Sequence, residues 1–199
     1  INVHYDHFIE YCLDICKSVA HAGFDRILIV DGHGSNEHLC EFIARRATIE
    51  TDALFASTMW TNLVVEVFEE IRESGAGGAA HACELETSAY LYLDASRVQM
   101  EKAVDHYGGA AGKEGSAFTS VDLTKGWGPV KVVQWTSGAT PHGVSGAATL
   151  ATKEKGKDIV DAAAENLLGF IREFRTTEKA KRTDHRAVKP KLPTLPSVD

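Results

Sequence analysis

The chain has 199 residues, of which 44% are hydrophobic, and this length and composition suit one well-packed domain. Its 21 Lys and Arg against 28 Asp and Glu give a formal charge of −7, which argues against non-specific binding to nucleic acid or to an anionic membrane. No apolar run reaches the ~18 residues of a membrane span, and we expect no signal segment. The four cysteines form no CxxC pair, which favours a reducing compartment, so a cytoplasmic protein is expected.

The first half of the sequence predicts alternating helices and strands. Apolar residues recur at helical spacing over residues 5–21, and a glycine follows as a stop. Residues 26–30 (RILIV) form a short apolar run that is typical of a strand buried on both faces in a parallel sheet. The helical period then resumes over residues 35–50. This order predicts an α/β fold with three layers, in which helices cover both faces of a mostly parallel sheet.

The same apolar patterns and turn residues predict the elements of the rest of the chain. Strands are predicted at 53–60 and 130–136, helices at 64–74, 81–93 and 149–174, and loops at 75–80 and over most of 105–146. The segment after residue 175 is charged and contains prolines, which is typical of a disordered or arm-like tail. The sequence thus predicts one domain over residues 1–175 and a tail over 176–199.

A lone histidine stands between two glycines where the first predicted strand gives way to a helix, in DGHGSN at residues 31–36. Ligands collect at the carboxyl ends of strands in an open α/β sheet. Glycine on both sides of His33 permits a tight turn and the close approach of a ligand. A histidine in this position can bind a metal or carry a proton, or it can simply fill a polar turn.

A second cluster, HACELETS at residues 81–88, follows the glycine-rich loop. It brings His81, Glu84 and Glu86 onto one short segment, and divalent metals accept such a mixture of imidazole and carboxylate ligands. The alternative is an ordinary helix whose first turn carries surface acids.

Together these stretches resemble the creatininase family, the creatinine amidohydrolases. DGHGSN is similar to the family's NGHGGN, and HACELETS is similar to its HAGExETS. A third match is GVSGAATLATKEKG at residues 143–156, which is similar to GVxGDPxxATxEKG. Three motifs in the family's order make the resemblance specific, where one motif alone would not.

The resemblance implies hydrolysis of a C–N bond in a small amide, cyclic or formyl-like, with two divalent ions (Zn, Mn or Fe) that activate water. His33 matches a metal ligand, and His81 matches the histidine that protonates the leaving nitrogen. Glu86 matches a carboxylate that is read either as a metal ligand or as an orienting group. Glu84, one helical turn from His81, is the second candidate catalytic residue. The substrate-binding candidates are Gly34, Ser35, Asn36, Trp135 and His142, and Trp127 is a further candidate for a pocket wall or for a core or oligomer contact. The family also implies a homo-oligomer, often a hexamer.

The sequence departs from the family in its metal ligands. The family's first metal-binding motif, EQHGxHLPxxTD, should precede the first helix, and nothing like it occurs here. NVHYDH at residues 2–7 lies where the family begins its helix, so it is a coincidental match. We therefore expect the missing segment to come from a second polypeptide, or the chain to be inactive.

Further departures concern the substrate and a cysteine. Gly34 and Ser35 replace the Tyr-Glu pair of enzymes that open creatinine, and the GAGGAA loop lacks their aromatic residue. Creatinine is therefore not the expected substrate. Asp31 replaces the usual Asn, and Cys83 replaces the usual Gly, either as a reactive thiol or as a buried structural residue.

Two rival functions remain open. A non-catalytic binding or assembly subunit would keep the fold without the first metal motif, and metal content would distinguish it from an enzyme. The run GHGSNE also fits a dinucleotide loop in part, but it lacks the third glycine of that fingerprint.

Overall fold

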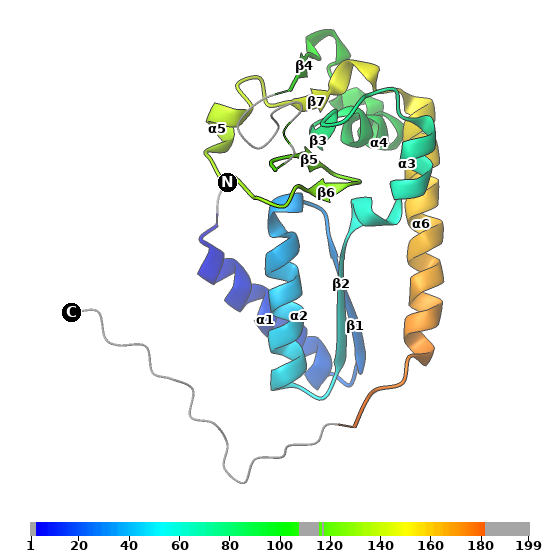
Figure 1. Cartoon of the computed structure of the whole chain (residues 1–199). Helices are drawn as coiled ribbons and strands as arrows, with labels where there is room; N and C mark the ends of the chain where they lie inside the picture. The colour runs from blue at the N-terminus through cyan, green and yellow to red at the C-terminus, as the bar shows by residue number, and fades with distance from the viewer. Residues whose placement is uncertain (1–2, 108–115, 117, 182–199) are drawn as a thin grey trace, which may run out of the picture.

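The computed structural model describes residues 3–107, 116 and 118–181. Helices and strands alternate in its first half, whereas its second half has short strands and ends in a long helix (Figure 1). The helices are α1 (Tyr5–His21), α2 (Glu37–Glu50), α3 (Val65–Ile71), α4 (Glu84–Asp94), α5 (Thr136–Ala139) and α6 (Lys153–Thr176). The strands are β1 (Arg26–Asp31), β2 (Leu54–Met59), β3 (Ala79–His81), β4 (Asp105–His106), β5 (Val121–Asp122), β6 (Gly126–Trp127) and β7 (Ser145–Ala147).

Strands β1 and β2 form a parallel pair, in register from Arg26 opposite Leu54 to Asp31 opposite Met59. Helices α1 and α2 pack on one face of this pair through a cluster of buried residues, Leu13, Cys16, Ile43 and Ala47, which Ile29 and Phe55 join from the strands. Figure 1 shows α6 on the other side of the strands from α1 and α2. The α/β fold with a parallel sheet is thus confirmed, although this sheet has only two strands among the residues placed by the structure.

The remaining strands pair antiparallel. Strand β7 lies between β3 and β4, and β5 and β6 form a separate hairpin. A second core, built on Val64, Phe68, Leu85 and Ile159, joins α3, α4 and α6 beneath these strands. The described residues therefore form two cores, one under the parallel pair and one under the antiparallel strands.

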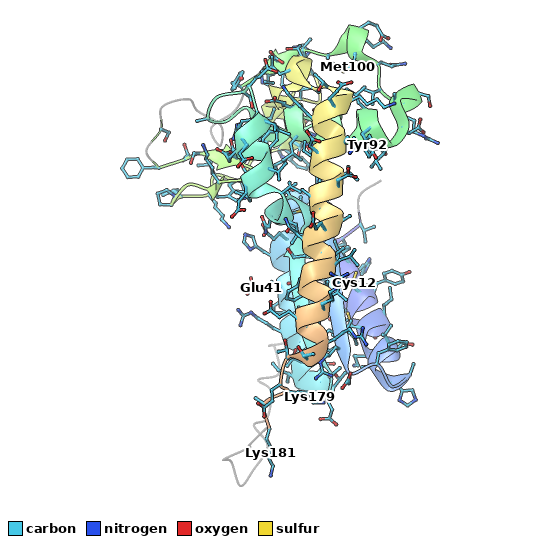
Figure 2. All side chains as sticks on the ribbon, turned by 90° about the vertical axis from the view of Figure 1, so that its right-hand side faces the viewer. Cys12, Glu41, Tyr92, Met100, Lys179 and Lys181 are labelled. Carbon is cyan, nitrogen blue, oxygen red and sulfur yellow. The ribbon has the colours of Figure 1, made fainter. Side chains whose placement is uncertain are left out.

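Helix α6 runs along both halves of the molecule, past Tyr92 of α4, and Lys179 lies just beyond its end (Figure 2). Its amphipathic pattern and the Thr152 hydroxyl, which accepts the Lys155 N–H, explain why it is long and where it begins. At Gly156 it approaches α4 so closely that an added Cβ would lie 1.8 Å from the Ser88 carbonyl oxygen. Within the described ranges, no helix is both long and apolar enough to span a bilayer.

Several predicted elements differ in the structure. The strand predicted at 130–136 is wrong: residues 130–135 have no regular structure, and Val133 and Trp135 are 90% and 85% exposed, since no strand of the described residues pairs with them. The loop predicted at 75–80 is shorter, because Ala79 begins β3 by pairing with β7. The helix predicted to reach residue 74 ends at Ile71. Of the predicted tail, residues 182–199 lie outside the described residues.

Candidate active site

A cavity of about 340 Å³ lies at the carboxyl ends of β1 and β2, where the antiparallel strands meet them. Five of the predicted site residues line it: His33, Gly34, Ser35, His81 and Glu86. The other lining residues are Glu37, Met59, Thr61, Asn62, Ala80, Val121, Asp122, Leu123, Gly126, Trp127, Val132, Val133, Gln134, Thr136, Ala139, Thr140 and Ser145. The structure thus brings the two histidine motifs, which are far apart in the sequence, to one cavity.

His33 reaches the cavity because of the turn that follows β1. Its backbone is extended (φ −145°, ψ 115°), and its N–H donates to Asp31 Oδ1 at 3.1 Å, which fixes the turn. The ring of His33 faces the ring of His81 edge-on, with 6.4 Å between their centroids. An imidazole pair at this spacing can share one small ligand between them.

His81 is oriented by the start of α4. It ends β3, and the next residue, Ala82, has a left-handed backbone (φ +44°), which is unusual for a residue other than glycine. The Glu86 carboxylate accepts the Ala82 N–H at 2.6 Å, and the Thr87 hydroxyl donates to the Ala82 carbonyl at 3.1 Å. Glu86 thus lines the cavity and at the same time holds the turn that carries His81.

Glu84 does not lie in the cavity, so the structure gives no support to its predicted catalytic role. Its side chain is fully buried between α4 and α6, where its carboxylate accepts the Ser74 N–H at 2.9 Å and pairs with Lys155 Nζ at 2.6 Å. Burial alone would raise the pKa of Glu84, but these hydrogen bonds outweigh it and lower that pKa. Glu84 therefore stabilises the contact between two helices.

Three of the predicted substrate-binding residues also lie off the cavity wall. Asn36 is not among the lining residues, although its neighbours Gly34 and Ser35 are. Trp135 is 85% exposed because the segment around it forms no strand. His142 is exposed and packs against the ring of His106, at 6.0 Å between centroids. Trp127, by contrast, does line the cavity.

Buried charges surround the site. Asp31 is 6% exposed, its Oδ2 has no hydrogen-bond partner among the described residues, and burial raises its pKa. Asp122 is 5% exposed and is paired with Arg72 at 3.0 Å.

The sequence did not predict Thr61, Asn62 and Asp122 as site residues, although all three line the cavity. The first two follow β2 and could have been found by applying the strand-end rule to that strand. Asp122 could not have been found in this way, because a hairpin of two-residue strands leaves no periodic pattern in the sequence.

The described residues alone do not fit a divalent metal. His33 and Glu86 supply donor atoms of the right kind, but no group of three His, Cys, Asp or Glu side chains lies close enough to hold an ion anywhere in the part of the chain that the structure describes. Metal sites of this type use at least three protein ligands. A complete metal site would therefore need ligands beyond this set.

Comparison with known proteins decides the family. The model of the creatininase family, described as creatinine amidohydrolase, matches residues 1–171. The chain belongs to the creatininase family. This creatininase-family protein is 29% identical over 179 residues to 3-dehydro-scyllo-inosose hydrolase of Thermotoga maritima, a match that covers 84% of this chain and 56% of that enzyme.

Solved structures agree with this assignment. A Bacteroides fragilis structure assigned as a creatinine amidohydrolase superposes with a TM-score of 0.73 at 25% identity, covering 91% of this chain and 66% of the other. A creatininase structure superposes with a TM-score of 0.65 at 21% identity, covering 89% and 67%, and supports the fold. The chain thus spans about half of the curated relative and about two thirds of the structural one.

Proposed function

We propose that this creatininase-family protein takes part in the metal-dependent hydrolysis of a C–N bond in a small amide, cyclic or formyl-like, and that creatinine is not its substrate. The observation that carries the proposal is that the family's two histidine motifs meet in one cavity, with the rings of His33 and His81 6.4 Å apart and Glu86 beside them. Solved creatininases include manganese and zinc forms, which supports a divalent metal here.

His81 would supply the proton that the reaction needs. When water adds to an amide carbonyl carbon, the C–N bond breaks only if the departing nitrogen gains a proton. The His81 imidazole lies on the cavity wall and is held in place by the Ala82 turn, which Glu86 fixes through its 2.6 Å hydrogen bond. His33 and Glu86 would be two of the metal ligands.

We further propose that the other metal ligands lie on an extended segment outside the described residues, which docks along the edge of β1 opposite β2. In the described residues β1 pairs only with β2. Helices α1 and α2 share one core on one face of this pair. Because crossovers between parallel strands are right-handed, a parallel strand that feeds α1 belongs on the opposite edge of β1 from β2. Its carboxyl end would then lie next to Asp31 and His33.

Exposed apolar side chains on α1 and β1, the two elements that such a segment would adjoin, are consistent with docking. Tyr11 and Ile15 of α1 are 68% and 47% exposed, and Val30 near the end of β1 is 46% exposed. Parallel sheets are normally covered on both faces and extend beyond two strands. The unpartnered Oδ2 of buried Asp31 lies at the same end of β1 and would gain a donor from the incoming segment.

The test is an assay of small lactams, cyclic imides, N-formyl amides and creatinine, in which new amines are detected by NMR. Mn²⁺ or Zn²⁺ is present together with a synthetic peptide that has the sequence preceding the α1-equivalent helix in the Bacteroides fragilis relative, because the described residues supply too few metal ligands. We expect turnover of at least one non-creatinine amide, and a loss of about 10²- to 10⁴-fold in His81→Asn, because the general acid is removed. His21→Gln, an exposed histidine of α1, is the matched control and should retain activity.

One observation favours a second candidate function. The Thermotoga maritima relative is named for the hydrolysis of an inosose, a ketone of a cyclic polyol that contains no amide bond. Turnover of 3-dehydro-scyllo-inosose without turnover of any amide in the same assay would replace the first proposal by this one. No turnover of either class, together with no bound metal, would support a binding or assembly subunit.

A further inference from the structure

Arg72 is an almost fully buried arginine that joins α3 to the wall of the candidate active site. Its side chain is 6% exposed and lies over the Phe68 ring, 5.0 Å from its centroid. The guanidinium donates to Asp122 Oδ2 at 3.0 Å, to the Gly75 carbonyl at 2.8 Å and to the Ser74 carbonyl at 2.9 Å. Because Nη1 also donates to Glu69 Oε1 at 2.5 Å, all three nitrogens are engaged, in a planar arrangement that lysine could not reproduce.

Asp122 belongs to the β5–β6 hairpin, which forms part of the cavity wall. Five residues of this hairpin line the cavity: Val121, Asp122, Leu123, Gly126 and Trp127. Strands of two residues do not hold a hairpin together on their own. The hairpin is also fixed from outside: the Leu123 N–H donates to the Ala79 carbonyl at 2.6 Å, the Thr61 hydroxyl donates to the Leu123 carbonyl at 3.4 Å, and Asp122 forms a buried ion pair with Arg72.

Glu69 of α3 strengthens the same attachment. It pairs with Arg72, accepts the Thr124 hydroxyl at 2.8 Å and lies 3.1 Å from Lys125 Nζ. Burial alone would raise the pKa of Glu69, but these partners lower it to about 2, so the carboxylate stays charged at neutral pH. One charged cluster thus fastens α3 to the turn of the hairpin.

We propose that Arg72 is a positioning residue for the candidate active site: through Asp122 it holds the Val121–Trp127 wall in the cavity that His33 and His81 share. Arg72 itself does not line the cavity, so it acts through the wall alone. Without the guanidinium, Asp122 would be a buried charge with no cation, and the hairpin would move to bring it to water. The effect on substrate rests on the proposed function, whereas the effect on the wall does not.

The test follows Trp127 by fluorescence in a Trp60→Phe, Trp135→Phe background, which leaves it as the single tryptophan of the three in the chain. Trp127 is 41% exposed, so its quenching by acrylamide can still rise. We expect Arg72→Met to raise the quenching constant by roughly twofold, because the wall loosens around the unpaired Asp122. The double variant Arg72→Met, Asp122→Asn should return toward the parent value, because it leaves no unpaired charge.

Lys155→Met is the matched control. Lys155 is also a buried cation, paired with Glu84 at 2.6 Å, but it lies between α4 and α6 and not on the cavity wall. This variant should lower the melting temperature without changing the quenching of Trp127. Should Arg72→Met fail to fold by circular dichroism, Arg72→Lys keeps the charge and should give an intermediate quenching constant.

The proposal is overturned if Arg72→Met, or Arg72→Lys in its place, quenches like the parent, or if the double variant is as perturbed as the single one. If an amide substrate is found, Arg72→Met should also raise its KM by about tenfold with a smaller change in kcat, as expected of displaced binding contacts. Because the fluorescence needs no turnover, failure of the amide assay leaves this test intact.

Discussion

Cys83 shows how burial determines the chemistry of a single side chain at the site. It stands next to the His81 turn, where a reactive thiol was one of two interpretations of the sequence. The structure buries it completely, and burial raises the pKa of its thiol to about 12. Since the thiolate is the nucleophile, a thiol with this pKa is inert near neutral pH. The structural interpretation is the one that the geometry supports.

Cys83 should therefore resist alkylation while the protein is folded. With iodoacetamide at pH 8, we expect Cys12, which is only partly buried, to be modified first, and Cys83 to react only after unfolding. Cys40 provides an internal comparison, because burial raises the pKa of its thiol to about 11. Peptide mass spectrometry at successive times gives the order, and early labelling of Cys83 in folded protein would contradict its assignment as a structural residue.

At the scale of elements, the close contact of α4 with α6 positions the helix that carries Glu86. Gly156 makes this contact possible, since a Cβ there would lie 1.8 Å from the Ser88 carbonyl oxygen. The Ser88 hydroxyl accepts the Thr152 N–H at 3.1 Å, which fixes the start of α6 against α4. The glycine in the third family motif thus has a packing role.

Gly156→Ala should destabilise the protein by about 3 kcal/mol, because the two helices must move apart to admit the methyl group. Gly169→Ala is the matched control in the same helix, since nothing lies within 4 Å of a Cβ there. It should stabilise the protein by ~0.5–1 kcal/mol through the better helix propensity of alanine. Urea denaturation of both variants measures the difference, and equal effects would show that the contact is unimportant.

At the scale of the whole molecule, the sequence predicts helices and strands best where apolar residues repeat at a regular spacing. The long helices and the first strands follow from apolar spacing over many residues. His33 follows from its position between two glycines at the end of a strand, and His81 from its cluster with two carboxylates behind a glycine-rich loop. The strand predicted at 130–136 is wrong because, in the part of the chain that the structure describes, no strand pairs with it. Glu84 and Glu86 share one helical turn, and only the packing of α6 shows that Glu84 is buried in an ion pair while Glu86 faces the cavity. Such contacts depend on residues distant in the sequence.

Metal binding tests whether the site is completed from outside these residues. The chain alone should bind Mn²⁺ or Zn²⁺ weakly, because His33 and Glu86 are too few ligands. A synthetic peptide with the sequence that precedes the α1-equivalent helix in the Bacteroides fragilis relative should tighten binding by roughly a hundredfold, at least as much as a supporting group contributes to a metal site. A scrambled peptide should have no effect, and His33→Gln should remove the gain while His21→Gln keeps it. Calorimetric titration measures each affinity. Tight, stoichiometric binding by the chain alone would show that the described residues rearrange into a full site, and the β1 edge would then need no partner.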